Sequence, residues 1–111
     1  MKFIYIASKY TGMDSFIAVQ KQIEAANFLI DNGFVAISPL LNSVLLNMQK
    51  ERDWTTWIAI DLELLSKCDA LIRLPGESKG ADIEVDYARL NGIPVYADMR
   101  LLLEEIDPCH P

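Results

Sequence analysis

Short, mainly apolar runs alternate along this chain with longer stretches of helical periodicity, and that alternation limits the possible folds more than any other feature. The short runs predict strands at 3–7, 34–37, 69–74 and 94–97. The longer stretches predict helices over 54–67, 80–91 and 99–106. A first helix is predicted from Asp14 or Ser15, as its cap, to Asn32-Gly33, because helical spacing relates Phe16, Val19, Gln20, Ile23, Asn27 and Ile30.

Strands that alternate with helices indicate a parallel sheet covered by helices on both faces. We therefore predict an α/β fold, a flavodoxin- or Rossmann-like three-layer sandwich with four or five parallel strands in the order 2-1-3-4. The order reverses between the first and third strands, so a ligand is expected where 8–12 meets 75–80, outside the carboxyl ends of those strands.

The segment 40–53 does not fit the alternation, because it is apolar at its start and charged at its end. We interpret it as a loop with one helical turn. A connection of this length is typical of a lid or of a contact between subunits.

The bulk composition narrows the class of protein. With 111 residues, 51% of them hydrophobic, the chain is expected to form one domain over 1–106 with a tail at 107–111. A net charge of −6 argues against binding a nucleic-acid polymer. The first residues resemble neither a signal peptide nor a membrane span, so we expect a cytoplasmic location and no binding to a membrane. Two cysteines without a Cys-x-x-Cys pair and one histidine, His110, make us expect no metal and no cofactor.

The segment from Ser78 to Glu84 opens a predicted helix and carries the most informative pattern. Free N–H groups at a helix start can hold an anion, and Ser78 can add a hydroxyl donor. Gly80 and Glu84 lie four residues apart on one helix face, so the glycine leaves space for a ligand beside the carboxylate. A glycine followed by a glutamate is also a common helix start without function.

Asp61 is a second unusual carboxylate. Trp54, Ile58, Asp61 and Leu65 share one stripe of the predicted helix, which places an acidic side chain among apolar ones. A desolvated carboxyl has a raised pKa, as a general acid requires. The alternative is a buried aspartate that is paired or hydrogen-bonded for structural reasons.

Other candidates have a more frequent structural role. Tyr5 is expected in the core but can orient a carboxylate, and Asp69 is more typical of a strand-end hydrogen bond than of a ligand contact. Trp54 and Trp57 are more typical of a core or interface than of base stacking. The residues expected to contact the ligand from loops and helix starts are Ser8, Lys9, Thr11, Gly12, Asp69, Ser78 and Gly80.

Three motifs in order resemble the nucleoside 2-deoxyribosyltransferase superfamily, which includes the deoxynucleoside 5'-monophosphate N-glycosidases. They are Ile-Tyr5-Ile-Ala-Ser-Lys-Tyr-Thr-Gly, Asp61-Leu-x-x-Leu-x-x-Cys-Asp69 and Ser78-x-Gly80-x-x-x-Glu84, within residues 3–97. The resemblance implies that Glu84 attacks the anomeric carbon of a nucleoside or nucleotide. It also implies that Asp61 acts on the leaving base, that Tyr5 positions the nucleophile, and that the reaction is hydrolysis or transfer with retention.

The chain departs from the resemblance after the first predicted strand. Where the hydrolase branch has a Gly-Ser-x-Arg type phosphate loop, this chain reads Ser8-Lys9-Tyr10-Thr11. The nucleoside transferases have an acidic residue six positions before the nucleophile, and Ser78 stands there in this chain. A serine can donate to a phosphate that an aspartate would repel, which favours a 5'-monophosphate ligand, with Lys9 as a possible charge partner.

Two further hypotheses remain at this point. A non-catalytic nucleotide-binding module has the same fold, and a partner-binding protein can use the apolar residues of 40–48. Those apolar residues also predict a homo-oligomer, most simply a dimer.

Overall fold

The computed structural model describes residues 1–8 and 15–109, and in them a parallel sheet forms the centre. Its strands are β1 (Phe3–Ala7), β2 (Val35–Ile37), β3 (Ala70–Arg73) and β4 (Val95–Tyr96), in the order β2-β1-β3-β4. Each neighbouring pair is parallel, for example with Ile4 beside Ala36 on one side and Ala70 on the other. The predicted fold class and strand order are confirmed, with four strands in the described part of the chain.

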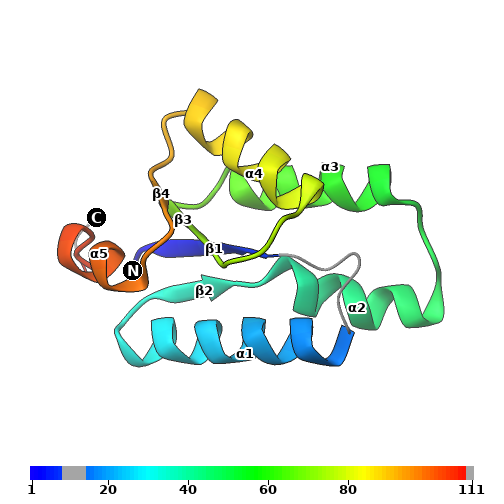
Figure 1. The fold of residues 1–111 in the computed structure, drawn as a ribbon, viewed down its shortest axis with the longest axis horizontal. Helices are drawn as coiled ribbons and strands as arrows, with labels where there is room; N and C mark the ends of the chain where they lie inside the picture. Colours follow the sequence, from blue (N-terminus) through cyan, green and yellow to red (C-terminus); the bar gives the residue numbers. More distant parts are fainter. Residues whose placement is uncertain (9–14, 110–111) are drawn as a thin grey trace.

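Helices cover both faces of the sheet, as Figure 1 shows, with α3 and α4 above it and α1 below. The helices are α1 (Ser15–Asp31), α2 (Pro39–Gln49), α3 (Trp54–Leu65), α4 (Lys79–Leu90) and α5 (Met99–Glu105). Four of them lie within two residues of their predicted bounds. Gly92 has a φ of +71° directly after α4, a left-handed conformation that favours glycine at the end of a helix.

The alternation of β1 divides the core into two halves. Ile4 and Ile6 pack with side chains of α1 and α5, whereas Tyr5 and Ala7 pack with side chains of α3 and α4. Successive side chains of a strand point to opposite faces, so both halves of the core depend on one buried strand. The half that contains Tyr5 is the one that reaches the carboxylates described below.

The buried face of α1 differs from the set of residues whose spacing predicted the helix. Phe16, Ile23 and Ile30 belong to that set but are 75%, 36% and 55% exposed. The face against the sheet consists instead of Ala18, Gln22, Ala25 and Leu29. Small side chains let the helix approach the sheet closely, and the glutamine is tolerated there because it is fully hydrogen-bonded.

The interpretation of 40–53 as a loop is wrong, because residues Pro39–Gln49 form helix α2. Ser38 caps it by accepting a hydrogen bond from the N–H of Leu41, and Pro39 occupies the first turn, where its missing N–H costs nothing. Ser-Pro was therefore a helix-start signal. Only 50–53 remains a connection before α3, so no long loop is present there.

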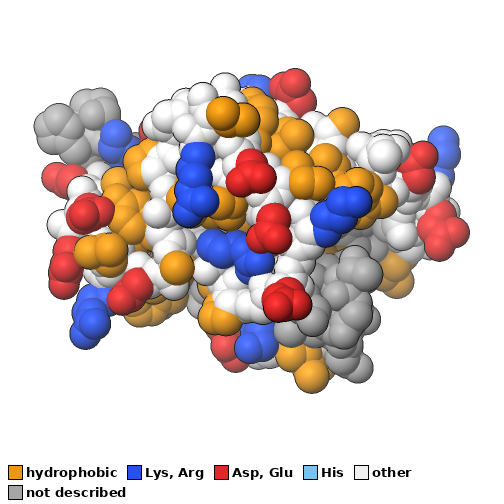
Figure 2. Space-filling model, turned by 45° about the horizontal axis from the view of Figure 1, so that its top comes forward, with side chains coloured by type: hydrophobic (Ala, Val, Ile, Leu, Met, Phe, Trp, Pro, Cys, Tyr) orange, Lys and Arg blue, Asp and Glu red, His pale blue; other side chains and the backbone are white. Residues whose placement is uncertain are grey.

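Two observations concern the surface. The face in Figure 2 mixes acidic and basic side chains with apolar ones and has no broad basic area. None of the helices in the described residues is long and apolar enough to cross a membrane.

Residues 107–109, set apart above as a tail, follow α5, and the carbonyl of Pro108 accepts a 2.9 Å hydrogen bond from the N–H of Lys2.

Candidate active site

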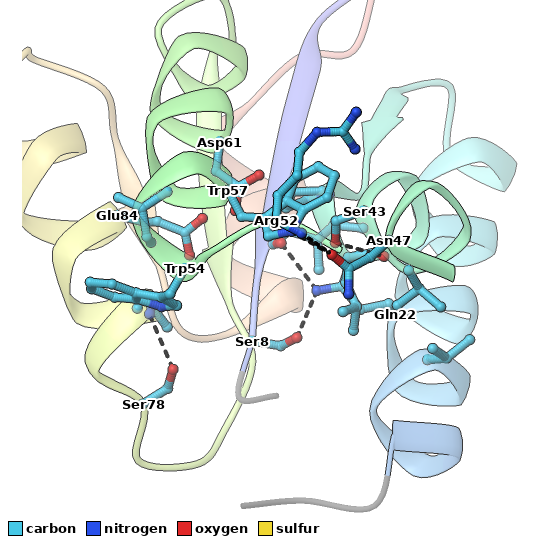
Figure 3. Close-up of a pocket in the computed structure, with 18 of the residues that line it drawn as sticks. Ser8, Gln22, Ser43, Asn47, Arg52, Trp54, Trp57, Asp61, Ser78 and Glu84 are labelled. Atoms are coloured by element: carbon cyan, nitrogen blue, oxygen red, sulfur yellow. Dashed lines mark hydrogen bonds between the residues drawn. The ribbon is translucent and has the colours of Figure 1, made fainter. Parts of the chain in front are cut away.

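A pocket of about 750 Å³ lies at the carboxyl ends of the strands. It is lined by residues of four helices, by Ile6 and Ser8 at the end of β1, and by Arg52 and Ser78, which precede α3 and α4. Figure 3 shows the labelled side chains around a common space. This is the predicted switch point of the sheet. The polar side chains on its wall are Ser8, Gln22, Ser43, Asn47, Arg52, Asp61, Ser78 and Glu84.

Glu84 enters the pocket from the second turn of α4 and is only 5% exposed. The hydroxyl of Tyr5, a fully buried residue of β1, donates a hydrogen bond to its Oε2 atom. Tyr5 does not line the pocket and lies behind the carboxylate. The hydrogen bond fixes one carboxylate oxygen and leaves Oε1 as the oxygen that can meet a ligand.

The electrostatic setting of Glu84 combines opposing effects. Burial raises the pKa of Glu84 to about 7, the Tyr5 hydrogen bond lowers it, the charge of Asp61 raises it and that of Arg73 lowers it. The pKa of Tyr5 is strongly raised, first by its own burial and then by the carboxylates of Glu84 and Asp61. Tyr5 is therefore a permanent hydrogen-bond donor, and it stabilises the ionised form of Glu84.

Asp61 enters the same pocket from α3, the helix beside α4 (Figure 3). Trp54 and Ile58 line the pocket on the same helix stripe, and Leu65 continues that stripe into the core. Burial raises the pKa of Asp61 to about 6. The structure thus places two carboxyl groups with raised pKa values in one partly apolar cavity, as paired acid–base chemistry requires.

Ser78 and Gly80 form the start of α4 at the edge of the pocket. The Ser78 hydroxyl caps the helix by accepting a 3.2 Å hydrogen bond from the N–H of Ala81. A Cβ added to Gly80 would lie 3.7 Å from Ile58 and 3.8 Å from Trp54, which is ordinary contact. A larger residue would therefore fit at this position and would narrow the pocket between Trp54 and Ile58.

Ser8 follows β1 and lines the same pocket. Its hydroxyl accepts a 2.6 Å hydrogen bond from the side-chain amide of Gln22, a residue of α1 that is 1% exposed. Sequence analysis missed Gln22, because a glutamine in an amphipathic helix is normally solvated. Its position seven residues before the buried Leu29 was the available signal.

A polar cluster on the α2 side was also missed. The Oδ1 atom of Asn47 accepts hydrogen bonds from the Trp57 indole N–H at 3.1 Å and from the Arg52 backbone N–H at 3.0 Å. The Arg52 guanidinium lies 5.7 Å from the centre of the Trp57 ring. Of these residues, Asn47 lies in α2, so the interpretation of 40–53 as a loop gave no reason to place it in the pocket.

The structure brings most of the predicted site residues together. Ser8, Asp61, Ser78, Gly80 and Glu84 line one pocket, and Tyr5 contacts Glu84 from behind. Lys9, Thr11 and Gly12 lie outside the described residues.

Asp69 is not brought to this site. It precedes β3 at the opposite edge of the sheet, where its carboxylate accepts a 2.7 Å hydrogen bond from the N–H of Phe3. It is absent from the pocket wall and has the strand-end role given above as the more typical one. Within residues 1–8 and 15–109, no group of three or more histidine, cysteine, aspartate or glutamate side chains is arranged to hold a metal ion.

Two solved structures resemble this fold. The 2-deoxyribosyltransferase of Bacillus psychrosaccharolyticus has a TM-score of 0.63 and 21% identity, over 87% of this chain and 75% of its own. The CMP N-glycosidase BcmB of Clostridium botulinum has a TM-score of 0.58 and 19% identity, over 98% of this chain and 86% of its own. At the level of the fold, these matches confirm the resemblance drawn from the three motifs.

Sequence comparison gives a less specific result. No curated protein matches the chain. The model of a family described as a domain of unknown function, DUF4406, matches residues 2–97. That range includes every strand and all of the pocket residues named above, and the chain therefore belongs to the DUF4406 family.

Proposed function

We propose that this protein is an enzyme that breaks or exchanges the N-glycosidic bond of a nucleoside 5'-monophosphate, with Glu84 as nucleophile. One observation carries the proposal: a buried glutamate, held at one oxygen by a buried tyrosine, shares a pocket with a second carboxyl group. Both named structural neighbours act at such bonds, which supports the reaction class.

The proposed reaction has two steps. In the first, Oε1 of Glu84 attacks C1' of the sugar, the bond from C1' to the base nitrogen breaks, and Asp61 gives its proton to the leaving base. In the second, water or another base attacks C1', the ester to Glu84 breaks, and Asp61 takes up the proton of the attacking group. Two inversions at C1' give retention of configuration.

The two carboxyl groups need different protonation states for the first step. Their pKa values of about 7 and about 6 mean that the pair holds roughly one proton near neutral pH. Tyr5 donates to Glu84 and stabilises its anion, whereas Asp61 has no hydrogen bond to another described residue. Because Glu84 has the higher pKa, the more populated singly protonated form carries the proton on Glu84. The proposed first step uses the less populated form, with the proton on Asp61 and the negative charge on Glu84, and the Tyr5 hydrogen bond favours that form.

Incubation with a panel of nucleosides and their 5'-monophosphates tests the proposal directly. Release of free base, detected by mass spectrometry, is the expected result, and a second base in the mixture distinguishes transfer from hydrolysis. A rise in melting temperature with a nucleotide but no base release from any compound would favour the non-catalytic binding module instead.

Removal of the Tyr5 hydroxyl should lower activity and change its pH dependence. In Tyr5→Phe the Glu84 anion loses a charge-assisted hydrogen bond, so its pKa rises and kcat/KM falls by about 10- to 100-fold. The ascending limb of the pH profile should move to higher pH. Tyr87→Phe, at a half-buried position of α4 that packs against the same half of the core, is the matched control. An unshifted ascending limb in Tyr5→Phe would show that Tyr5 does not act through Glu84.

The proposed 5'-phosphate rests on the donors at the pocket edge. Ser78 stands at the start of α4, where backbone N–H groups and the helix dipole favour an anion. Ser8 adds a second hydroxyl from β1. The pocket carries two carboxyl groups deeper inside, so the phosphate is expected at the serine edge and the sugar beside Glu84.

A carboxylate at position 78 should reverse this preference. Ser78→Asp keeps a helix cap but repels a phosphate, so kcat/KM for the monophosphate should fall by at least about tenfold relative to the nucleoside. Ser78→Thr keeps the hydroxyl and the cap and serves as control. The phosphate assignment is wrong if wild type prefers the unphosphorylated compound, or if Ser78→Asp leaves the preference unchanged.

We also propose a homodimer formed through α2. Leu45, Leu46 and Met48 are 70%, 51% and 79% exposed on this helix, and a contact between two copies of α2 would remove these apolar side chains from water. Light scattering at micromolar concentration should give twice the 12.5 kDa mass of one chain. Leu45→Glu should give the mass of a single chain, whereas Leu90→Glu, at an 86% exposed position of α4, should not. A monomeric wild type would contradict the proposal.

A further inference from the structure

We propose that Gln22 is a positioning residue, which holds the Ser8 hydroxyl so that Ser8 faces the ligand as a hydrogen-bond donor and thereby selects a phosphate. The inference rests on the proposed function, since it assigns how one side of that pocket recognises its ligand. It starts from the burial of Gln22, whose side chain is 1% exposed although it borders a cavity of about 750 Å³.

The orientation of the Gln22 amide follows from its partners. Its Nε2 group donates to the carbonyl of Ile6 at 3.2 Å and to the hydroxyl of Ser8 at 2.6 Å. A carbonyl can only accept, so the nitrogen must be the atom on that side. On the other side, Oε1 accepts from the hydroxyl of Ser38, which itself accepts from the N–H of Leu41. The cap of α2 and the end of β1 are thus joined through one side chain.

This connection determines what Ser8 offers to the pocket. Its oxygen already accepts from Gln22, so the hydroxyl hydrogen has no partner among the described residues. Ser78 is in the same state, because its oxygen accepts from the N–H of Ala81. On the pocket wall, the Ser8 and Ser78 oxygens therefore each accept a hydrogen bond from the protein, and each hydroxyl can donate its hydrogen to a ligand (Figure 3).

A ligand group that uses the free donor of both hydroxyls needs acceptor atoms directed at each of them. A phosphate has three such oxygens, whereas a free 5'-hydroxyl has one oxygen and brings a hydrogen of its own. Gln22 contributes by orientation, because without its Nε2 donor the Ser8 hydroxyl can rotate and donate to the carbonyl of Ile6 or to solvent. Selectivity for the phosphate is therefore expected to depend on a residue that does not itself touch the phosphate.

The test uses Gln22→Met, which keeps the length of the side chain and removes its polar atoms. Dissociation constants are measured by calorimetry for a 2'-deoxynucleoside and its 5'-monophosphate, with kcat/KM added where base is released. We expect Gln22→Met to raise the dissociation constant of the monophosphate by about tenfold and to change that of the nucleoside by less than about twofold. Gln20→Met, at an exposed position of the same helix, should change neither.

A double-mutant cycle separates positioning from a general structural role. If Gln22 acts through Ser8, then Gln22→Met should have no further effect in a Ser8→Ala background. Additive effects, or equal weakening of nucleoside and monophosphate, would overturn the inference. If Gln22→Met does not fold, Ser38→Ala removes the donor to Oε1 together with the cap of α2, and its melting temperature reports the loss of the cap. Binding of the monophosphate should weaken by about threefold in this variant, and binding of the nucleoside should not change. Equal loss for both ligands there would also overturn it.

The outcomes distinguish this inference from the proposed reaction. If wild type binds the monophosphate selectively in a Gln22-dependent way but no variant releases base, the reaction is wrong and the role of Gln22 stands. If base is released and the selectivity does not respond to Gln22→Met, the role of Gln22 is wrong and the reaction stands. If wild type binds the nucleoside and the monophosphate equally well, both the role of Gln22 and the phosphate assignment are wrong.

Discussion

Glu84→Gln should abolish base release and leave the fold intact. Glutamine has the shape of glutamate and keeps an oxygen that accepts the Tyr5 hydrogen bond, but its amide is not a nucleophile. Loss of a covalent nucleophile lowers the rate by at least about 10³-fold in a mechanism of this type. The measurement is single-turnover base release with excess enzyme, so that slow product release cannot hide the loss.

The matched control is Asp86→Asn, which removes one negative charge from an exposed position two residues along α4. It should keep wild-type activity. Acid quenching during turnover should trap a glycosyl adduct whose mass increase lies on the peptide containing Glu84 in wild type and is missing in Glu84→Gln. Base release by Glu84→Gln at the wild-type rate, with no adduct in wild type, would exclude Glu84 as nucleophile.

The second large effect is a fall in stability as the pH rises. The folded chain raises the pKa of Glu84 from 4.5 to about 7, so the folded state binds this proton more tightly than the unfolded state. Below about pH 4.5, Glu84 is protonated in both the folded and the unfolded state, and its burial does not lower the free energy of unfolding through this proton. Between about pH 4.5 and 7 the unfolded chain releases the proton, and folding becomes less favourable by on the order of 3 kcal/mol. Asp61, with a pKa raised to about 6, acts in the same direction.

Denaturant unfolding at pH values from 4 to 8 measures this effect. The free energy of unfolding of wild type should fall across the window, and that of Glu84→Gln should fall by roughly half as much, because only Asp61 of the two buried carboxyl groups then loses a proton. Asp86→Asn corrects for the general effect of removing one charge from an acidic protein. Parallel curves for wild type and Glu84→Gln would mean that Glu84 is not buried as an acid in the folded protein.

The regular elements and their order were readable from the sequence by itself. Each strand and four of the five helices rest on local periodicity, and the alternation of strands with helices determines a parallel sheet with few possible orders. Glu84 and Asp61 were also identifiable, because a carboxylate beside a glycine and a carboxylate on an apolar stripe are anomalies of single helices. Such signals lie within one or two helical turns of sequence.

Only the tertiary structure decided which residues of different elements meet. Tyr5 and Glu84 are 79 positions apart, and their hydrogen bond depends on how α4 packs on β1. The face of α1 that is buried depends on the close approach of helix and sheet, which admits two alanines and a hydrogen-bonded glutamine but not Phe16. Asp69 and Asp61 belong to one sequence motif, yet Asp69 lies at the amino ends of the strands and Asp61 lines the pocket at their carboxyl ends. Periodicity records which side of its own element a residue occupies, whereas a pocket is made by the packing between elements.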